Sequence, residues 1–206
     1  MSDYQPDEST AQVDLLRFLS ACYHEPAAEF SEERLFDSVA LATRQAYPEL
    51  AGLADRLKEA FAAESLQTLL VDYTRLFLGP MKALASPYST SWLPTPAVND
   101  EVLPSAVLAF YGEAGFDVDG ELAELPDHLA IELEFLYVLT FNIQQANLVG
   151  NIQDAEATVA LRTRFLAEHL RAWLVPFTAA IKENADTDFY RVLAELTEEI
   201  VVKRLA

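Results

Sequence analysis

The stretch DYTRLFLGPMKALASPYSTSW, residues 72–92, decides how the chain is organised, because a long helical pattern stops within it. Apolar residues ahead of the break recur at helical spacing, at positions 66, 69, 70, 73 and 77. They predict a helix over 64–78 that packs one face on a core. Gly79-Pro80 ends this helix, because glycine can adopt the left-handed conformation and proline has no N–H to continue the helical hydrogen bonds. The aromatic and proline-rich connector that follows, to about residue 98, is too long for an ordinary turn.

Helical patterns on both sides of this connector predict the rest of the fold. They span residues 11–23, 31–46 and 48–62 upstream, and 99–112, 126–141 and 154–183 downstream, and a last helix begins at Asp186 or Thr187. We expect Ser31 to cap the 31–46 helix and Pro176 to kink or split the 154–183 helix. No run alternates for long enough to form a strand. The sequence therefore predicts an all-α, bundle-like single domain (1–206) of about nine to eleven helices, with halves at about 1–78 and 99–206.

Composition excludes several classes of protein. The chain has 206 residues, of which 51% are apolar, and it carries a net charge of −19 with a pI near 4.3. Nucleic acid is an unsuitable partner, since phosphate binding needs clusters of Lys and Arg. No apolar run reaches the roughly 18 residues of a membrane span, so no membrane insertion is expected. The first residues, MSDYQPDEST, lack the basic and apolar regions of a signal peptide, and we expect the protein to stay in the cytoplasm.

Signatures of catalysis and of metal binding are missing from the sequence. No glycine-rich phosphate loop, no GxSxG elbow and no Glu-x-x-His pair of a di-metal bundle occurs. His128 and Glu132 could share a helix face, but one such pair supplies only two ligands. The single cysteine, Cys22, lies in an apolar helical pattern, which favours a buried structural role over a disulfide or a thiolate cage. The sequence indicates no enzyme, no metal and no cofactor.

Charge is distributed unevenly along the chain. Between Lys82 and Arg162 there is no Lys or Arg, whereas Asp and Glu recur throughout this interval. Such a segment is typical of a solvated acidic surface, and charge alone favours that interpretation. The alternative is that the segment steers a cationic peptide towards a cleft whose apolar walls come from Phe77, Tyr88 and Trp92.

Pro126-Asp127-His128 marks the start of the most apolar helix of the chain. We expect the Asp127 carboxylate to accept backbone N–H bonds as the N-cap, with Pro126 setting the approach of the chain. His128 would then lie in the first turn, where the helix dipole disfavours its protonation. Beside the acidic segment, these side chains offer a donor and an acceptor for a polar contact with a bound peptide.

Short motifs occur in a fixed order along the chain from about Val13. They are Tyr73-Thr74-Arg75-Leu76-Phe77-x-Gly79-Pro80, Ser86-Pro87-Tyr88-x-x-x-Trp92, Glu124-Leu125-Pro126-Asp127-His128-x-x-x-Glu132-Leu133-x-Phe135, Phe165-x-x-x-His169-Leu170-x-x-Trp173 and Phe189-Tyr190-x-x-Leu193-Ala194-x-x-Thr197. Together they resemble the TorD/DmsD/NarJ family of cytoplasmic chaperones, which are dedicated to molybdoenzyme maturation.

This resemblance implies an all-helical chaperone rather than an enzyme. Its partner would be the apo form of a molybdopterin oxidoreductase catalytic subunit, or the twin-arginine signal peptide of that subunit. The chaperone would hold the subunit until the cofactor is inserted, so that export does not occur too early. The peptide-binding residues carried over from the family motifs are Leu76, Phe77, Tyr88 and Trp92 in the apolar part of a groove, and Pro126, Asp127 and His128 at its flank.

One departure from the family pattern bears on the arginine contact. The family usually places a Glu-Ser pair after the Pro-aromatic motif, whereas this chain has Ser89-Thr90. The resemblance therefore implies that Asp127 or another acid has to bind an arginine of the leader.

The sequence is also compatible with two other functions. One is an assembly factor, similar to NarJ, for a leaderless molybdoenzyme subunit that faces the cytoplasm. The other is a small helical metalloenzyme that uses His128 and acidic neighbours. The long connector could also act as a domain-swap hinge, so a monomer and a swapped homodimer are both compatible with the sequence.

Overall fold

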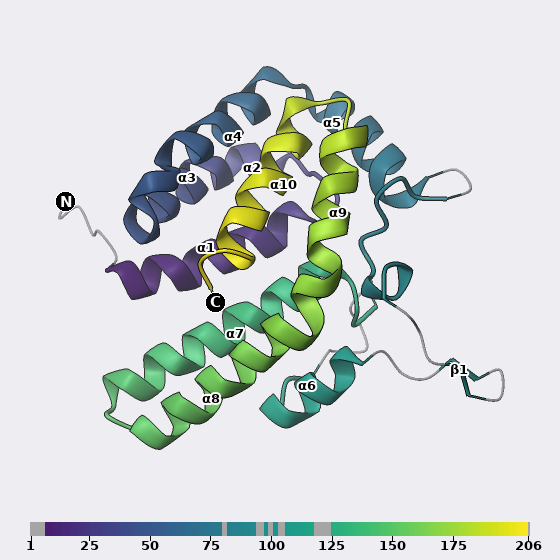
Figure 1. The fold of residues 1–206 in the computed structure, drawn as a ribbon. Coiled ribbons are helices and arrows are strands. Elements are labelled where there is room, and N and C mark those ends of the chain that lie inside the picture. The colour runs from purple at the N-terminus through teal and green to yellow at the C-terminus, as the bar shows by residue number, and fades with distance from the viewer. Residues whose placement is uncertain are drawn as a thin grey trace.

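Helices form almost all of the regular structure in the described part of the chain (Figure 1). The computed structural model describes residues 7–79, 82–93, 97–98, 101–102, 106–117 and 125–205. The α-helices are α1 (Glu8–Cys22), α2 (Glu29–Glu32), α3 (Leu35–Ala46), α4 (Ala51–Ala63), α5 (Leu66–Tyr73), α6 (Val107–Ala114), α7 (Leu129–Leu148), α8 (Ile152–Phe165), α9 (Arg171–Asn184) and α10 (Asp188–Val201). Short 3-10 helices cover Pro48–Leu50 and Ser89–Ser91, and π-helical turns cover Thr74–Leu78 and Leu166–Leu170. The predicted all-α fold is confirmed.

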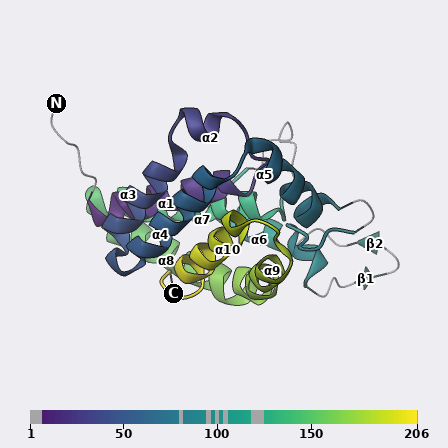
Figure 2. The same cartoon turned by 90° about the horizontal axis from the view of Figure 1, so that it is seen from above.

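A ribbon of two short strands at the end of the connector is the only sheet that the described residues form. β1 (Ala97–Val98) pairs antiparallel with β2 (Glu101–Val102), with Ala97 opposite Val102. The ribbon lies at the opposite end of the molecule from α3 (Figure 2). Strands this short carry no alternating pattern, so the sequence held no signal for them.

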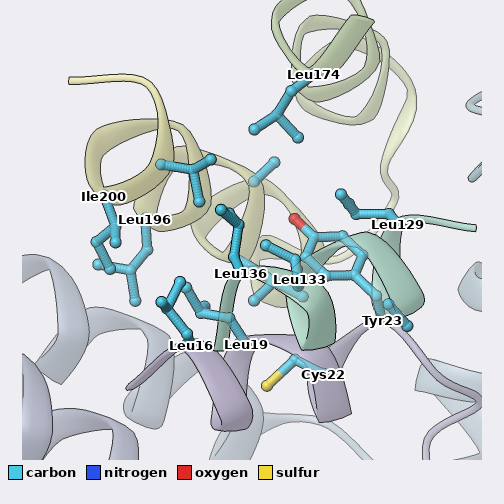
Figure 3. Packing of buried hydrophobic residues seen from close by; sticks show 14 of the residues in the cluster. Leu16, Leu19, Cys22, Tyr23, Leu129, Leu133, Leu136, Leu174, Leu196 and Ile200 are labelled. Atoms are coloured by element: carbon cyan, nitrogen blue, oxygen red, sulfur yellow. The ribbon is translucent and has the colours of Figure 1, made fainter. Parts of the chain in front are cut away.

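The central helix of the core is α7, as its nearly all-round apolar pattern predicts. α1 runs antiparallel along it, because Ser20 Oγ donates to Ala130 O (2.8 Å) near one end and Gln144 Nε2 donates to Thr10 Oγ1 (2.8 Å) near the other. Figure 3 shows the buried side chains gathered between α1, α7 and α10, including Leu16, Leu19, Leu133, Leu136, Leu196 and Ile200. Each fully buried leucine of this kind contributes about 1.5–3 kcal/mol to folding.

Cys22 lies inside the same core and is 1% exposed. Burial raises the pKa of its thiol far above the usual range. Because the thiolate is the reactive form, this cysteine is chemically inert and has the structural role that the sequence predicts.

The helix ahead of the connector ends at the predicted glycine. Gly79 has a φ of 62°, and a Cβ atom at this position would lie 2.4 Å from Lys82 O. α5 does not continue to this point as an α-helix, because Thr74–Leu78 forms a π turn that Gly79 N closes by donating to Thr74 O (2.7 Å). Only glycine fits both the backbone conformation and the close approach of the chain.

The predicted 31–46 helix is two helices in the structure. Arg34 adopts the left-handed conformation, with a φ of 54°, between α2 and α3. A left-handed residue interrupts the helical hydrogen bonds, so α3 begins afresh at Leu35. The prediction that Ser31 caps this helix is wrong, because Ser31 lies within α2.

The predicted break at Pro176 is in the wrong place. Pro176 lies inside α9 on an exposed face, where water can satisfy the carbonyl that loses its partner. The interruption lies instead at the π turn of Leu166–Leu170, where one extra residue fits into a helical turn. α8 and α9 change direction at this turn (Figure 1).

The start of the last helix agrees with the prediction, whereas the start of the helix after the connector does not. Thr187, one of the two predicted positions, is the N-cap of α10. α6 begins at Val107, so the predicted helix start near residue 99 is wrong: residues 99–100 lie outside the described residues, and Glu101–Val102, inside the predicted helix, form β2. None of the helices in the described ranges combines the length and the apolar character needed to cross a bilayer.

Candidate functional site

The connector returns to the N-terminal end of α7 and is fixed there by backbone hydrogen bonds. Leu129 N donates to Pro87 O (2.8 Å), and Ser89 N donates to Asp127 O (2.9 Å). Between these two bonds, Tyr88 and His128 form an isolated antiparallel bridge. The structure therefore brings together two of the predicted site segments, which are about forty residues apart in the sequence.

The side chain of Asp127 also holds this junction between the connector and the start of α7. It is 4% exposed, and its Oδ2 accepts from Thr90 Oγ1 (2.7 Å) and from Thr90 N (3.2 Å). Among the residues that the structure describes, no donor reaches the second oxygen, Oδ1. Thr90, one of the two residues that replace the family Glu-Ser pair, thus uses one of the two carboxylate oxygens.

The N-cap of α7 is His128 rather than Asp127, so that part of the prediction is wrong. His128 Nδ1 accepts from Ala130 N (3.1 Å), which requires this nitrogen to be unprotonated. The ring is 1% exposed, stacks on His24 with 6.0 Å between centroids, and meets Tyr88 edge to face at 5.1 Å. His128 and not Asp127 caps the helix because Thr90 occupies the Asp127 carboxylate, and because the extended backbone conformation of an N-cap occurs at His128.

Half-buried side chains surround the junction. Trp92 Nε1 donates to Ser86 O (2.8 Å), and its ring packs against Phe177 at 6.3 Å between centroids. Pro126 presents its carbonyl to the Tyr111 hydroxyl, at 2.8 Å. Tyr88, Trp92 and Pro126 each keep part of their surface exposed.

Leu76 and Phe77 belong to the core instead of an open groove. They are 0% and 3% exposed. Four aromatic rings surround Phe77, those of Tyr23, Tyr73, Phe177 and Tyr190. These two residues point inward because they continue the apolar stripe that packs α5 on the core, so a peptide cannot reach them in this conformation.

An open pocket of about 390 Å³ lies on the outer face of the same segment. Its lining residues are Gln67, Leu70, Val71, Thr74, Arg75 and Gly79. Val71 and Leu78 on this segment are 56% and 55% exposed, and Leu66, which the periodicity assigned to the core, is 40% exposed. The sequence-based prediction did not include this pocket, although apolar residues outside the core stripe, such as Val71, were a signal for it.

Arg75 is fixed at the edge of this pocket by acidic partners. Its guanidinium pairs with the buried Asp72 (3.0 Å) and with Asp186 (2.9 Å). Asp72 also accepts from Thr187 N and Thr187 Oγ1, both at 2.8 Å. This network ties the end of α5 to the start of α10.

Glu132 is completely buried and links the connector, the π turn of Leu166–Leu170 and α9. Its carboxylate pairs with His169 Nε2 (2.8 Å) and accepts from Trp173 Nε1 (3.0 Å), and the Ser89 side chain also bonds to it. Burial raises the pKa of this carboxyl, and the bonds from His169 and Trp173 oppose that rise. The π turn that carries His169 is thereby linked to the connector.

His128 and Glu132 do not form a shared site. His128 faces His24 and Tyr88, whereas Glu132 faces the π turn and α9. Across the described residues, no group of three or more His, Cys, Asp or Glu side chains is placed to hold a metal ion.

Comparisons with known proteins agree on one family. The chain is 29% identical to the chaperone protein TorD of Shewanella loihica over 212 residues, which cover 94% of this chain and 91% of that protein. It is 29% identical to the perchlorate reductase assembly chaperone protein of Dechloromonas aromatica, over 86% of this chain and 79% of that protein. These relatives are named as chaperones and not as enzymes.

A solved structure from Archaeoglobus fulgidus, described as a redox enzyme maturation protein, has the same fold. It matches with a TM-score of 0.53 and 17% identity, over 98% of this chain and 99% of that one. The family model of the nitrate reductase delta subunit matches residues 37–179, which is more than half of the chain. The resemblance to the TorD/DmsD/NarJ chaperones is therefore confirmed, and the chain belongs to the nitrate reductase delta subunit family.

Proposed function

We propose that this chaperone binds the catalytic subunit of a molybdopterin oxidoreductase in the cytoplasm, together with the twin-arginine leader of that subunit. It holds the subunit until the cofactor is inserted and so prevents premature export. The names of its relatives support a chaperone and give no support to the alternative of a metalloenzyme. The observation that carries the leader contact is Asp127, which keeps one carboxylate oxygen without a described partner beside half-buried aromatic rings.

In this proposal, a leader arginine donates to Asp127 Oδ1. Hydrogen bonds between two charged groups are roughly twice as strong as neutral ones, which makes a nearly buried carboxylate a selective contact for arginine. Tyr88 and Trp92 provide apolar surface next to it. The pocket beside Val71, on the segment that leads into the connector, takes an apolar side chain from the leader.

A synthetic leader peptide with paired arginines tests the Asp127 contact. We expect Asp127→Asn to weaken binding about tenfold, because asparagine keeps an acceptor for Thr90 but loses the charge. The matched control is Glu33→Gln, which removes an exposed acid far from the junction in the sequence. Fluorescence anisotropy measures the affinities. If Asp127→Asn binds the peptide as tightly as the wild type does, the arginine contact is rejected.

The apolar contact has its own test. Val71→Ser removes an exposed aliphatic side chain from the pocket without opening the core. We expect a severalfold weaker affinity for the same peptide, and no change for a peptide whose apolar stretch is replaced by serine and glycine. Equal losses for both peptides would show that the pocket does not bind the apolar stretch.

A second candidate function is assembly of a molybdoenzyme subunit that has no leader. The description of the matching family as a nitrate reductase delta subunit favours it. Co-purification with a catalytic subunit that lacks its leader, combined with no measurable binding of the leader peptide, would favour this function over the first.

A further inference from the structure

The turn that joins α7 to α8 exposes three large aliphatic side chains at the end of a helical hairpin. Leu148, Val149 and Ile152 are 72%, 78% and 68% exposed. These are the highest exposures among the large apolar side chains of the described residues. We refer to these three side chains as the hairpin tip. The proposed leader site uses none of them.

The hairpin tip projects beyond the helix that covers α7. The hydrogen bond between Thr10 and Gln144 lies near the start of α1, which begins at Glu8. α7 continues for four more residues to Leu148, which is about 6 Å at 1.5 Å per residue. In Figure 1 the free ends of α7 and α8 stand clear of α6 and α10.

Backbone hydrogen bonds hold the turn in one conformation. Gly150 has a φ of 72°, Gly150 N donates to Asn147 O (3.1 Å), and Asn151 N donates to Ala146 O (2.8 Å). This pair of bonds is the Schellman motif, which fixes the end of a helix. Asn151 then caps α8 by accepting from Asp154 N (3.4 Å). A turn that is already ordered loses little conformational entropy when it binds a partner.

The hairpin tip also lies in an uncharged stretch. Residues 135–153 contain no Asp, Glu, Lys, Arg or His, although 23% of the chain is charged. At that frequency about four charges are expected in a stretch of this length, and exposed turns usually carry them for solubility. Strongly exposed aliphatic side chains without charges around them are typical of an interaction surface.

Charge and area separate the possible partners. A second copy of this chain would bring another net charge of −19, and two convex tips that meet each other would bury far less than the roughly 800 Å² per partner of a stable interface. A bilayer surface attracts Lys and Arg, whereas the charges that flank the stretch are Glu134 and Asp154. A convex, uncharged and apolar tip fits an apolar concavity in a protein, where its burial desolvates no charge.

We propose that the hairpin tip docks into an apolar, uncharged concavity on the mature part of the client enzyme. This inference rests on the proposed function, because it takes the same client as its partner. The leader and the mature subunit then bind at two separate places on the chaperone. Because the two ligands are covalently linked, the full-length subunit binds more tightly than either part alone.

The test uses two probes from one oxidoreductase of the same organism, its leader as a synthetic peptide and its apo catalytic subunit without the leader. We expect Leu148→Ser/Ile152→Ser to lower the affinity for the leaderless subunit at least tenfold, and to leave the affinity for the leader peptide unchanged. Leu41→Ser, which replaces a leucine that is 44% exposed on α3, is the matched control and should change neither affinity. Thermal unfolding of each variant verifies the fold.

Two results would overturn the docking proposal while leaving the proposed function standing. One is an unchanged affinity of the double variant for the leaderless subunit, and the other is leader binding by a wild type that does not bind the leaderless subunit. A wild type that binds neither probe overturns both proposals. Self-association in sedimentation, or binding to vesicles of phosphatidylcholine and phosphatidylglycerol, that depends on the hairpin tip would assign it to a second copy or a bilayer.

Discussion

At the scale of single residues, buried carboxylates connect the connector to the helices. Asp127 binds Thr90, and Glu132 binds His169, Trp173 and Ser89. A buried carboxylate is unfavourable unless hydrogen bonds surround it, so each of these residues depends on the others to stay in place. Glu132 and His169 are therefore positioning residues for the junction and do not contact a bound peptide themselves.

Glu132 makes stability depend on pH in a specific direction. Because burial raises its pKa in the folded state, the folded protein holds the proton at pH values where the unfolded chain has released it. This contribution is fully present below the ordinary value of 4.5 and is lost as the pH rises through the folded pKa. In that pH window we expect the free energy of unfolding of the wild type to fall by about 1.4 kcal/mol per pH unit relative to that of Glu132→Gln.

Urea unfolding of both proteins from pH 4.5 upwards measures this difference. The matched control is Glu134→Gln on the same helix, because Glu134 is exposed. The difference in free energy of unfolding between the wild type and this control should not fall with pH in this way. A difference between the wild type and Glu132→Gln that stays constant with pH would contradict the assignment.

At the scale of elements, both π turns bond to residues in or near the junction: Leu76 O accepts from Ala85 N of the connector, and His169 pairs with Glu132. Thr74–Leu78 ends the helix before the connector, and Leu166–Leu170 carries His169 to Glu132. Each turn accommodates one more residue than an α-helical turn, and this rotates the following side chains. Sequence periodicity predicted a helix through both segments, because a single extra residue hardly changes an apolar pattern.

The glycine at the end of the first π turn provides a matched pair of substitutions. Gly79→Ala places a Cβ atom 2.4 Å from Lys82 O at a positive φ, and we expect it to lower the free energy of unfolding by about 2–3 kcal/mol. Gly52→Ala in the α4 helix meets nothing within 4 Å and should raise it by about 0.5–1 kcal/mol. Chemical denaturation measures both. Equal effects at the two positions would refute the role of Gly79.

At the scale of the whole molecule, the net charge of −19 affects stability. Repulsion among like charges destabilises the compact state, and salt screens it. We expect the unfolding temperature at neutral pH to rise by a few degrees, roughly 2–6 °C, between low salt and about 0.3 M salt. Sodium chloride and tetramethylammonium chloride should have equal effects if screening is the cause. A rise with sodium alone would indicate binding of that ion.

Part of the candidate site could be predicted from the sequence. The motifs identified Tyr88, Trp92 and Pro126-Asp127-His128, and the structure brings these segments together. The prediction placed the N-cap of α7 one residue too early, at Asp127 instead of His128, because the partner that occupies the Asp127 carboxylate is Thr90, about forty residues away in the sequence. The leader contacts themselves stay predictions.

The sequence by itself determined the all-α fold, the helix end at Gly79 and the family, because periodicity, glycine chemistry and motif order are local properties of the chain. Only the tertiary structure decided that Phe77 is a core residue, that Glu132 meets His169, and that the hairpin tip is exposed. The physical reason is that burial and long-range hydrogen bonds depend on which helices pack together. Apolar residues have the same pattern in the sequence whether a neighbouring helix covers them or leaves them exposed to water.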